Sequence, residues 1–243
     1  WNDDNELACG AHTTNDKGLT NLGKQYIKKL EKKHILIDVS HMSKKSFYDT
    51  LENTKDPIIA SHSCAYTVCN HKRNLSDNQI KQIAKRQGII GICFCKPFLT
   101  TNSKATVKDI IKHINHIVEL VGIDYVGFGS DFDGVEEENK LEDIRSVKDI
   151  NKIIIELEKE GYSKENIEQI NDEDLKNILT KVNELVSHSN NSAFSVYSHK
   201  FINTARYLIN NLPEVEPDID DNFSIQNNTQ ISEEEFLNRC EKL

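Results

Sequence analysis

Residues 35–41 read Ile35-Leu36-Ile37-Asp38-Val39-Ser40-His41, an apolar run typical of a buried strand that ends in a histidine. A second run, Pro57-Ile58-Ile59-Ala60-Ser61-His62, ends in the same way. A third, Tyr125-Val126-Gly127-Phe128-Gly129-Ser130-Asp131, ends in a carboxylate. Because parallel strands of one sheet place their C-terminal ends at the same edge, we expect His41, His62 and Asp131 to lie close together.

The first 181 residues alternate strand-like runs with helix-like spacing of apolar residues. We expect strands at residues 34–39, 58–61, 89–94 and 125–129, and helices at about 18–33, 43–51, 76–87, 107–121, 146–160 and from 163 onward. Ser43 and Ser76 are expected to cap the second and third helices, and Gly88 to end the third. The alternation predicts an α/β fold in which right-handed crossovers connect parallel strands.

Four strands are too few to close a barrel. A (β/α)8 barrel usually takes about 250 residues, and this pattern reaches only its fourth strand by residue 130. We therefore expect residues 1–181 to be the C-terminal half, about four βα units, of a TIM-type (β/α)8 barrel. Since the chain begins with Trp1 and not with Met, we expect a longer protein to supply the other half.

Residues 182–243 are expected to form a C-terminal extension. The stretch 187–192 is rich in Ser and Asn and is typical of a linker. From residue 211 onward there are nine acidic and two basic residues, a composition typical of a solvated, partly disordered acidic tail.

Composition narrows the classes of partner and the compartment. The net charge of −9 disfavours nucleic acid and anionic membrane surfaces as partners. No apolar run reaches the roughly 18–20 residues needed to cross a bilayer, and no signal peptide is visible. The six cysteines form no CxxC pair and are interpreted as buried, reduced thiols, so we expect a cytoplasmic location.

Four side chains carry candidate chemistry. A single strand-end histidine is more often structural, but His41 and His62 at successive strand ends form a candidate metal pair, since neutral imidazoles bind zinc at about 2.0–2.1 Å. Asp131 is a candidate proton acceptor from metal-bound water. Arg73, if it is not a simple surface residue, offers a guanidinium fork that suits a substrate carboxylate.

The chain resembles the membrane (renal) dipeptidase family, which are zinc dipeptidases of the amidohydrolase-like barrel class. The resemblance covers about residues 1–181. It rests on residues 1–5, Gly18-Leu19-Thr20 with Gly23-Lys24, residues 35–41, residues 59–63, Arg73-Asn74-Leu75-Ser76-Asp77 and residues 121–134.

This resemblance implies a site with two zinc ions. His41 and His62 would bind the second ion, Asp131 would be the catalytic acid/base, and Arg73 would hold the substrate near its C-terminal carboxylate. The implied reaction is attack of a metal-bridging hydroxide on the carbonyl of a dipeptide. The family's His-x-Asp pair and bridging Glu are absent, so only one of the two zinc sites is partly represented. Trp1 stands where some members carry a substrate-binding histidine.

Two alternatives to a dipeptidase stay open. The same site could act on another small amide, or the chain could be a non-catalytic or split half-barrel that binds a partner. Because a half-barrel leaves strand edges and an apolar face exposed, we expect this piece alone to aggregate or form a homodimer, with little or no activity.

Overall fold

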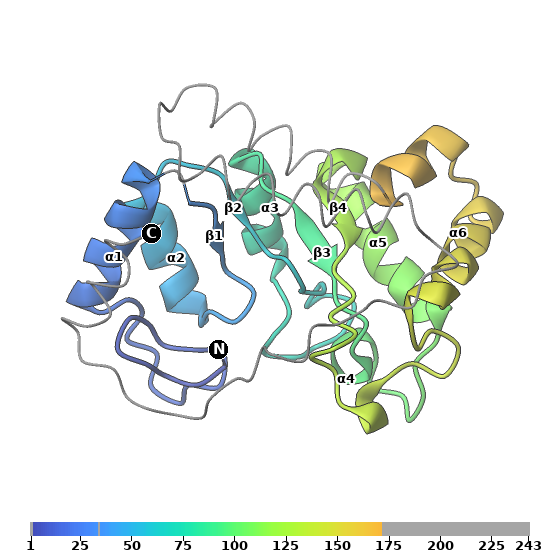
Figure 1. Ribbon diagram of the computed structural model, residues 1–243, viewed down its shortest axis with the longest axis horizontal. Coiled ribbons are helices and arrows are strands. Elements are labelled where there is room, and N and C mark those ends of the chain that lie inside the picture. The colour runs from blue at the N-terminus through green and yellow to red at the C-terminus, as the bar shows by residue number, and fades with distance from the viewer. Residues whose placement is uncertain (1, 34, 172–243) are drawn as a thin grey trace, which may run out of the picture. The chain divides into compact units, whose positions relative to one another are not determined.

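The computed structural model describes residues 2–33 and 35–171, and within them parallel strands alternate with helices. Strand β1 (Ile37–Asp38) pairs in parallel with β2 (Ile58–Ile59), and β3 (Ile90–Ile92) pairs in parallel with β4 (Val126–Phe128). A parallel bridge between Ala60 and Ile90 joins the two pairs, so the strands follow one another in chain order (Figure 1). The prediction of an α/β fold with parallel strands is confirmed.

The helices lie where apolar spacing predicts them, with one addition. The α-helices are α1 (Asn21–Lys32), α2 (Lys44–Asn53), α3 (Asp77–Lys85), α4 (Lys96–Leu99), α5 (Val107–Val121) and α6 (Ile150–Lys159). Short 3-10 turns cover Ile123–Tyr125, Glu137–Asn139 and Val147–Asp149, and residues 164–171 are again helical. The short α4, which carries a proline at its start, has no counterpart among the predicted helices.

Both predicted serine caps are confirmed, and α3 ends at Lys85, just before the Gly88 that was expected to end it. The Ser43 side chain accepts from the backbone of Ser46, and Ser76 forms a capping box with Gln79. At the end of α3 the left-handed residue is Gln87 (φ 55°), and not Gly88. Backbone N–H groups of residues 87 and 88 bond the carbonyls of residues 84 and 83, which is the Schellman arrangement.

Two glycines let three strand ends approach one another. A Cβ at Gly91 or at Gly129 would collide with the carbonyl oxygen of Ser61. Only a residue without a side chain therefore permits the end of β2 to lie against β3 and the end of β4. This close approach brings the segments that carry His62 and Asp131 next to each other.

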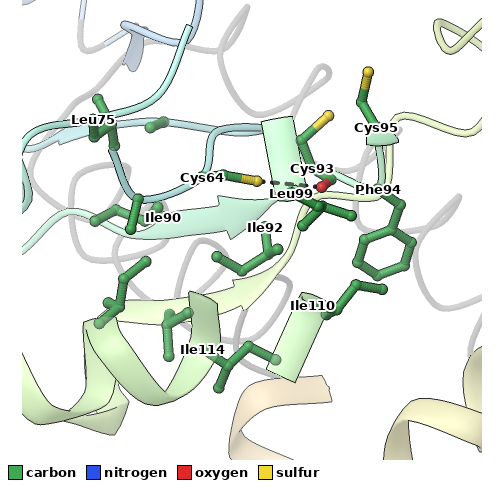
Figure 2. Close-up of a cluster of buried hydrophobic side chains, with 14 of the residues drawn as sticks. Cys64, Leu75, Ile90, Ile92, Cys93, Phe94, Cys95, Leu99, Ile110 and Ile114 are labelled. Carbon is green, nitrogen blue, oxygen red and sulfur yellow. Dashed lines mark hydrogen bonds between the residues drawn. The ribbon is translucent and has the colours of Figure 1, made fainter. Parts of the chain in front are cut away.

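The core is an isoleucine-rich layer that includes buried thiols (Figure 2). Ile90 and Ile92 of β3 and Ile110 and Ile114 of α5 are fully buried. Figure 2 shows the thiol of Cys64 donating a hydrogen bond to the carbonyl of Cys93, with the sulfur 3.3 Å from the oxygen. All described cysteines are free and buried: Cys9, Cys64, Cys69, Cys93 and Cys95.

Burial makes these core thiols poor nucleophiles. It raises the pKa of Cys64 and of Cys93 well above the usual range for a thiol, and that of Cys95 to about 11. The interpretation of these cysteines as buried, reduced thiols is confirmed. Cys240 lies outside the described residues.

Among residues 2–33 and 35–171, no helix is long and apolar enough to cross a membrane. The expected extension at residues 182–243, with its linker and acidic tail, lies outside the described residues, as does its expected boundary after residue 181. That division of the chain stays a prediction.

His113 on α5 is expected to make the fold sensitive to acid. Its buried ring accepts from the Ala65 N–H through Nδ1 (3.0 Å) and contacts the Leu99 carbonyl through Nε2 (3.0 Å). Burial lowers its pKa from 6.5 to about 4, so the unfolded chain takes up a proton first as the pH falls. Stability should therefore be unaffected by His113 above pH 6.5 and fall by about 3 kcal/mol between pH 6.5 and 4.

Urea unfolding at several pH values would measure this effect. His113→Gln should be less stable than the wild type at pH 7.5, because the amide replaces the two ring contacts imperfectly. Its stability should nevertheless fall less steeply towards pH 4. An unchanged slope in the variant would show that His113 does not cause the acid sensitivity.

Candidate metal centre

His41 and His62 face each other at the C-terminal ends of β1 and β2. Their Nε2 atoms lie 2.7 Å apart, and the two rings meet edge to face with centroids 4.7 Å apart. The parallel pairing of β1 with β2, in which Asp38 is opposite Ile59, sets both histidines at the same edge. The structure therefore brings together the pair that the sequence singled out.

Hydrogen bonds at the opposite ring nitrogens determine the tautomer of each histidine. Nδ1 of His41 lies 2.8 Å from the amide oxygen of Asn2, which can only accept, so this nitrogen carries a proton. Nδ1 of His62 lies 2.7 Å from the Ser61 hydroxyl, which itself donates to Asp38. Both Nε2 atoms therefore present lone pairs to the same point, an arrangement that a cation between them stabilises.

Both rings are also held in the neutral form that binds metals. Burial, together with the positive charge of Arg73, lowers the pKa of His41 to about 4. Burial lowers the pKa of His62 as well, against the opposing effect of the Asp131 carboxylate. Neutral imidazoles at pH 7 can bind a metal without first releasing a proton.

The donor set fits a zinc ion in part. Within residues 2–33 and 35–171, no group of three or more His, Cys, Asp or Glu side chains lies close enough together to hold a metal. A zinc site uses three or four protein ligands. His41 and His62 therefore provide two ligands of suitable chemistry, fewer than a complete zinc site uses.

Asp131 follows β4 in a strained backbone conformation. Its φ is 55°, in the left-handed region, and its carbonyl accepts from the N–H groups of Gly134 and Val135 at 3.1 Å. The absence of a side chain at Gly134 leaves room for the Asp131 carboxylate. The segment leading to Asp131 lies next to that of His62, because Gly129 packs against the carbonyl oxygen of Ser61. The carboxylate also acts to raise the pKa of His62, against the effect of burial. Backbone strain of this kind is frequent at functional sites.

Arg73 is buried, contrary to its interpretation in isolation as a surface residue. It is 4% exposed, and its Nε and Nη1 atoms have no hydrogen-bond partner. The guanidinium carbon lies 5.3 Å from the centre of the Phe98 ring. Its charge acts to lower the pKa of both His41 and His62. Unsatisfied buried N–H donors are suited to a carboxylate ligand.

Sequence reasoning missed three residues of this site. Asn2 and Ser61 hold the Nδ1 atoms of the histidines, and Asp38 accepts from Ser61. The sequence offers a signal for two of them, because short polar side chains beside a histidine can orient its ring. These are Asp38, three residues before His41, and Ser61, directly before His62.

A cavity of about 280 Å³ opens beside His41, along β1. Asp38, Ser40 and His41 form its polar wall. Most of its other walls are apolar and come from residues 5–30 and 36–37. Among the described residues, those that line the cavity include members of α1 and β1 and none of β2.

The chain matches the sequence model of a known protein family. The sequence model of the family described as "Membrane dipeptidase (Peptidase family M19)" matches residues 1–193 of the chain. The matched region contains His41, His62, Arg73 and Asp131.

Individual relatives point the same way. An uncharacterized dipeptidase, C965.12, of Schizosaccharomyces pombe is 35% identical over 162 residues, which are 64% of this chain and 39% of the relative. Dipeptidase tcpJ of Claviceps purpurea is 31% identical over 175 residues, or 70% of this chain and 40% of the relative.

A solved structure is also similar. It is a metallo peptidase from Rhodobacter sphaeroides, liganded with a phosphinate mimic of the dipeptide L-Ala-D-Ala. Its TM-score is 0.69 at 25% identity, with 74% of this chain and 54% of that chain covered. The chain thus spans about two fifths of the length of the two dipeptidases and about half of that of the solved metallo peptidase.

Proposed function

This chain belongs to the membrane dipeptidase family, and from that premise we propose that it forms the C-terminal half of a (β/α)8 barrel that hydrolyses dipeptides with the aid of zinc. The consecutive parallel order of β1 to β4 supports the half-barrel. The similarity to a metallo peptidase that was solved with a dipeptide mimic supports the substrate class.

The single observation that carries the proposal is the convergence of the His41 and His62 Nε2 atoms, 2.7 Å apart, next to the segment that leads to Asp131. His41 and His62 would hold the second of two zinc ions. When bound, zinc would supply Lewis-acid polarisation of the peptide carbonyl and activation of water. Asp131 would accept a proton from the attacking water and return it to the leaving amine. The Arg73 Nε and Nη1 donors would bind the C-terminal carboxylate of the dipeptide.

The ligands of the first zinc ion are proposed to lie outside the described residues, in which no three-ligand group is present. The 243-residue chain alone is therefore expected to show little activity and to dimerise through its exposed strand edges. A cytoplasmic location likewise stays a prediction from the sequence.

A dipeptide panel tests the proposed function directly. The full-length protein, freed of metal by chelation and then loaded with zinc, should hydrolyse dipeptides, and the metal-free protein should not. Dipeptides with a free C-terminal carboxylate should be much better substrates than the matching dipeptide amides, because only the carboxylate pairs with Arg73. Turnover of other small amides without dipeptides would favour a different hydrolase, and no turnover at all in the loaded protein would refute an enzyme of this kind.

A further inference from the structure

The Asp38 carboxylate ties the ends of β1 and β2 together. Its Oδ1 atom accepts from the Ser40 N–H (3.0 Å), the Ser40 hydroxyl (2.6 Å) and the Ser61 N–H (3.1 Å). Its Oδ2 atom accepts from the Ser61 hydroxyl. These hydrogen bonds hold the pKa of Asp38 below its usual value, although burial acts to raise it, so the side chain is an ionised acceptor.

The proton of Ser61 links this carboxylate to the histidine pair. A hydroxyl has one proton, and Ser61 donates it to Asp38. The Ser61 oxygen must then accept from Nδ1 of His62, which lies 2.7 Å away. His62 is left with its lone pair on Nε2, the atom that faces Nε2 of His41.

We propose that Asp38 is a positioning residue, which acts through Ser61 to fix His62 in the tautomer that can bind a metal through Nε2. The inference rests on the proposed function for the identity of the metal-binding atom. The orientation of the hydrogen-bond chain follows from the described contacts alone. Asn2 performs the same task for His41 by a direct contact.

Replacing Asp38 by Asn should reverse the direction of the hydrogen bonds that run from His62 through Ser61 to residue 38. Three donors converge on the Oδ1 position, so the oxygen of the new amide occupies it and the NH2 group faces Ser61. The amide then donates to the Ser61 oxygen, and the Ser61 hydroxyl turns to donate to Nδ1 of His62. The proton of His62 moves to Nε2, where it blocks the ligand position.

Nitrogen NMR of the metal-free, full-length protein tests this inference. With ring-labelled histidine, long-range proton–nitrogen correlations distinguish the two tautomers, and a His62→Gln sample assigns the signal. The wild type should carry the proton on Nδ1, and Asp38→Asn should carry it on Nε2. Zinc affinity, measured by competition with a chelator, should fall by about 10- to 100-fold in the variant.

Two further variants separate positioning from general damage. Ser63→Ala removes a buried hydroxyl that has no hydrogen-bond partner, so it should change neither the tautomer nor the zinc affinity. Ser61→Ala interrupts the chain of hydrogen bonds between Asp38 and His62. Adding Asp38→Asn to this variant should therefore weaken zinc binding no further. If circular dichroism shows that Asp38→Asn does not fold, the Ser61→Ala protein still tests the hydrogen-bond chain, because its His62 should lose the uniform Nδ1–H tautomer.

An Nε2–H tautomer in the wild type, or an unchanged tautomer in folded Asp38→Asn or Ser61→Ala, would overturn the inference. A wild type with the Nδ1–H tautomer that hydrolyses no dipeptide would refute the proposed function and leave the positioning role of Asp38 supported.

Discussion

Asp131→Asn is expected to lower kcat for dipeptide hydrolysis by about 10²- to 10⁴-fold, the usual contribution of a positioned general acid/base. KM should change little, because the amide keeps the size of the side chain and Arg73 still binds the substrate carboxylate. The fold should survive, since Asn tolerates the left-handed backbone that Asp131 adopts at φ 55°. Steady-state kinetics of the zinc-loaded, full-length protein would measure the effect.

Asp133 provides the matched control. It lies two residues further along the same loop and is exposed, so Asp133→Asn removes the same charge without removing the proposed proton acceptor. Its kcat should stay within about threefold of the wild type, as is usual for surface changes. If Asp131→Asn kept more than a tenth of the wild-type kcat, the proton-transfer role would have to be assigned to another group.

The convergence of the site could be predicted because it depends on backbone topology. Parallel strands deliver their C-terminal ends to one edge, and two histidines at equivalent positions must then lie near each other. The 2.7 Å separation of the Nε2 atoms of His41 and His62 agrees with that reasoning. Strand register suffices for this prediction, because each histidine lies three residues beyond the end of its paired strand.

The hydrogen-bond chain could not be predicted in the same way. Whether Ser61 donates to Asp38 or to His62 depends on side-chain torsions and on the neighbours that compete for each proton. The burial of Arg73 was equally hidden, since its sequence neighbours are polar and its covering contacts, such as the Phe98 ring, come from a distant segment. At the end of α3, Gly88 was expected to end the helix, but nothing in the sequence indicated that the preceding Gln87 adopts the left-handed conformation within the Schellman hydrogen bonds.

Arg73→Met is expected to change activity and stability in opposite directions. Burial is the main influence on the Arg73 guanidinium and lowers its pKa, and two of its nitrogens have no hydrogen-bond partner. Replacing such a buried charge by an apolar side chain of similar length should raise the free energy of unfolding by about 1–3 kcal/mol. The same change should lower kcat/KM for dipeptides by about 100-fold, chiefly through KM, because charge-assisted bonds to the substrate carboxylate are lost.

Arg86→Met is the matched control for Arg73→Met. The Arg86 guanidinium donates to the carbonyls of Thr54 and Leu51, both at 2.8 Å, so its charge is accommodated by the fold. Arg86→Met should therefore lower the free energy of unfolding by about 1–3 kcal/mol and leave kcat/KM nearly unchanged. Urea unfolding, kinetics on a dipeptide and kinetics on its C-terminal amide give three measurements for each variant. If Arg73→Met were destabilising like Arg86→Met, or slowed the amide as much as the free dipeptide, then Arg73 would serve the fold and not the substrate carboxylate.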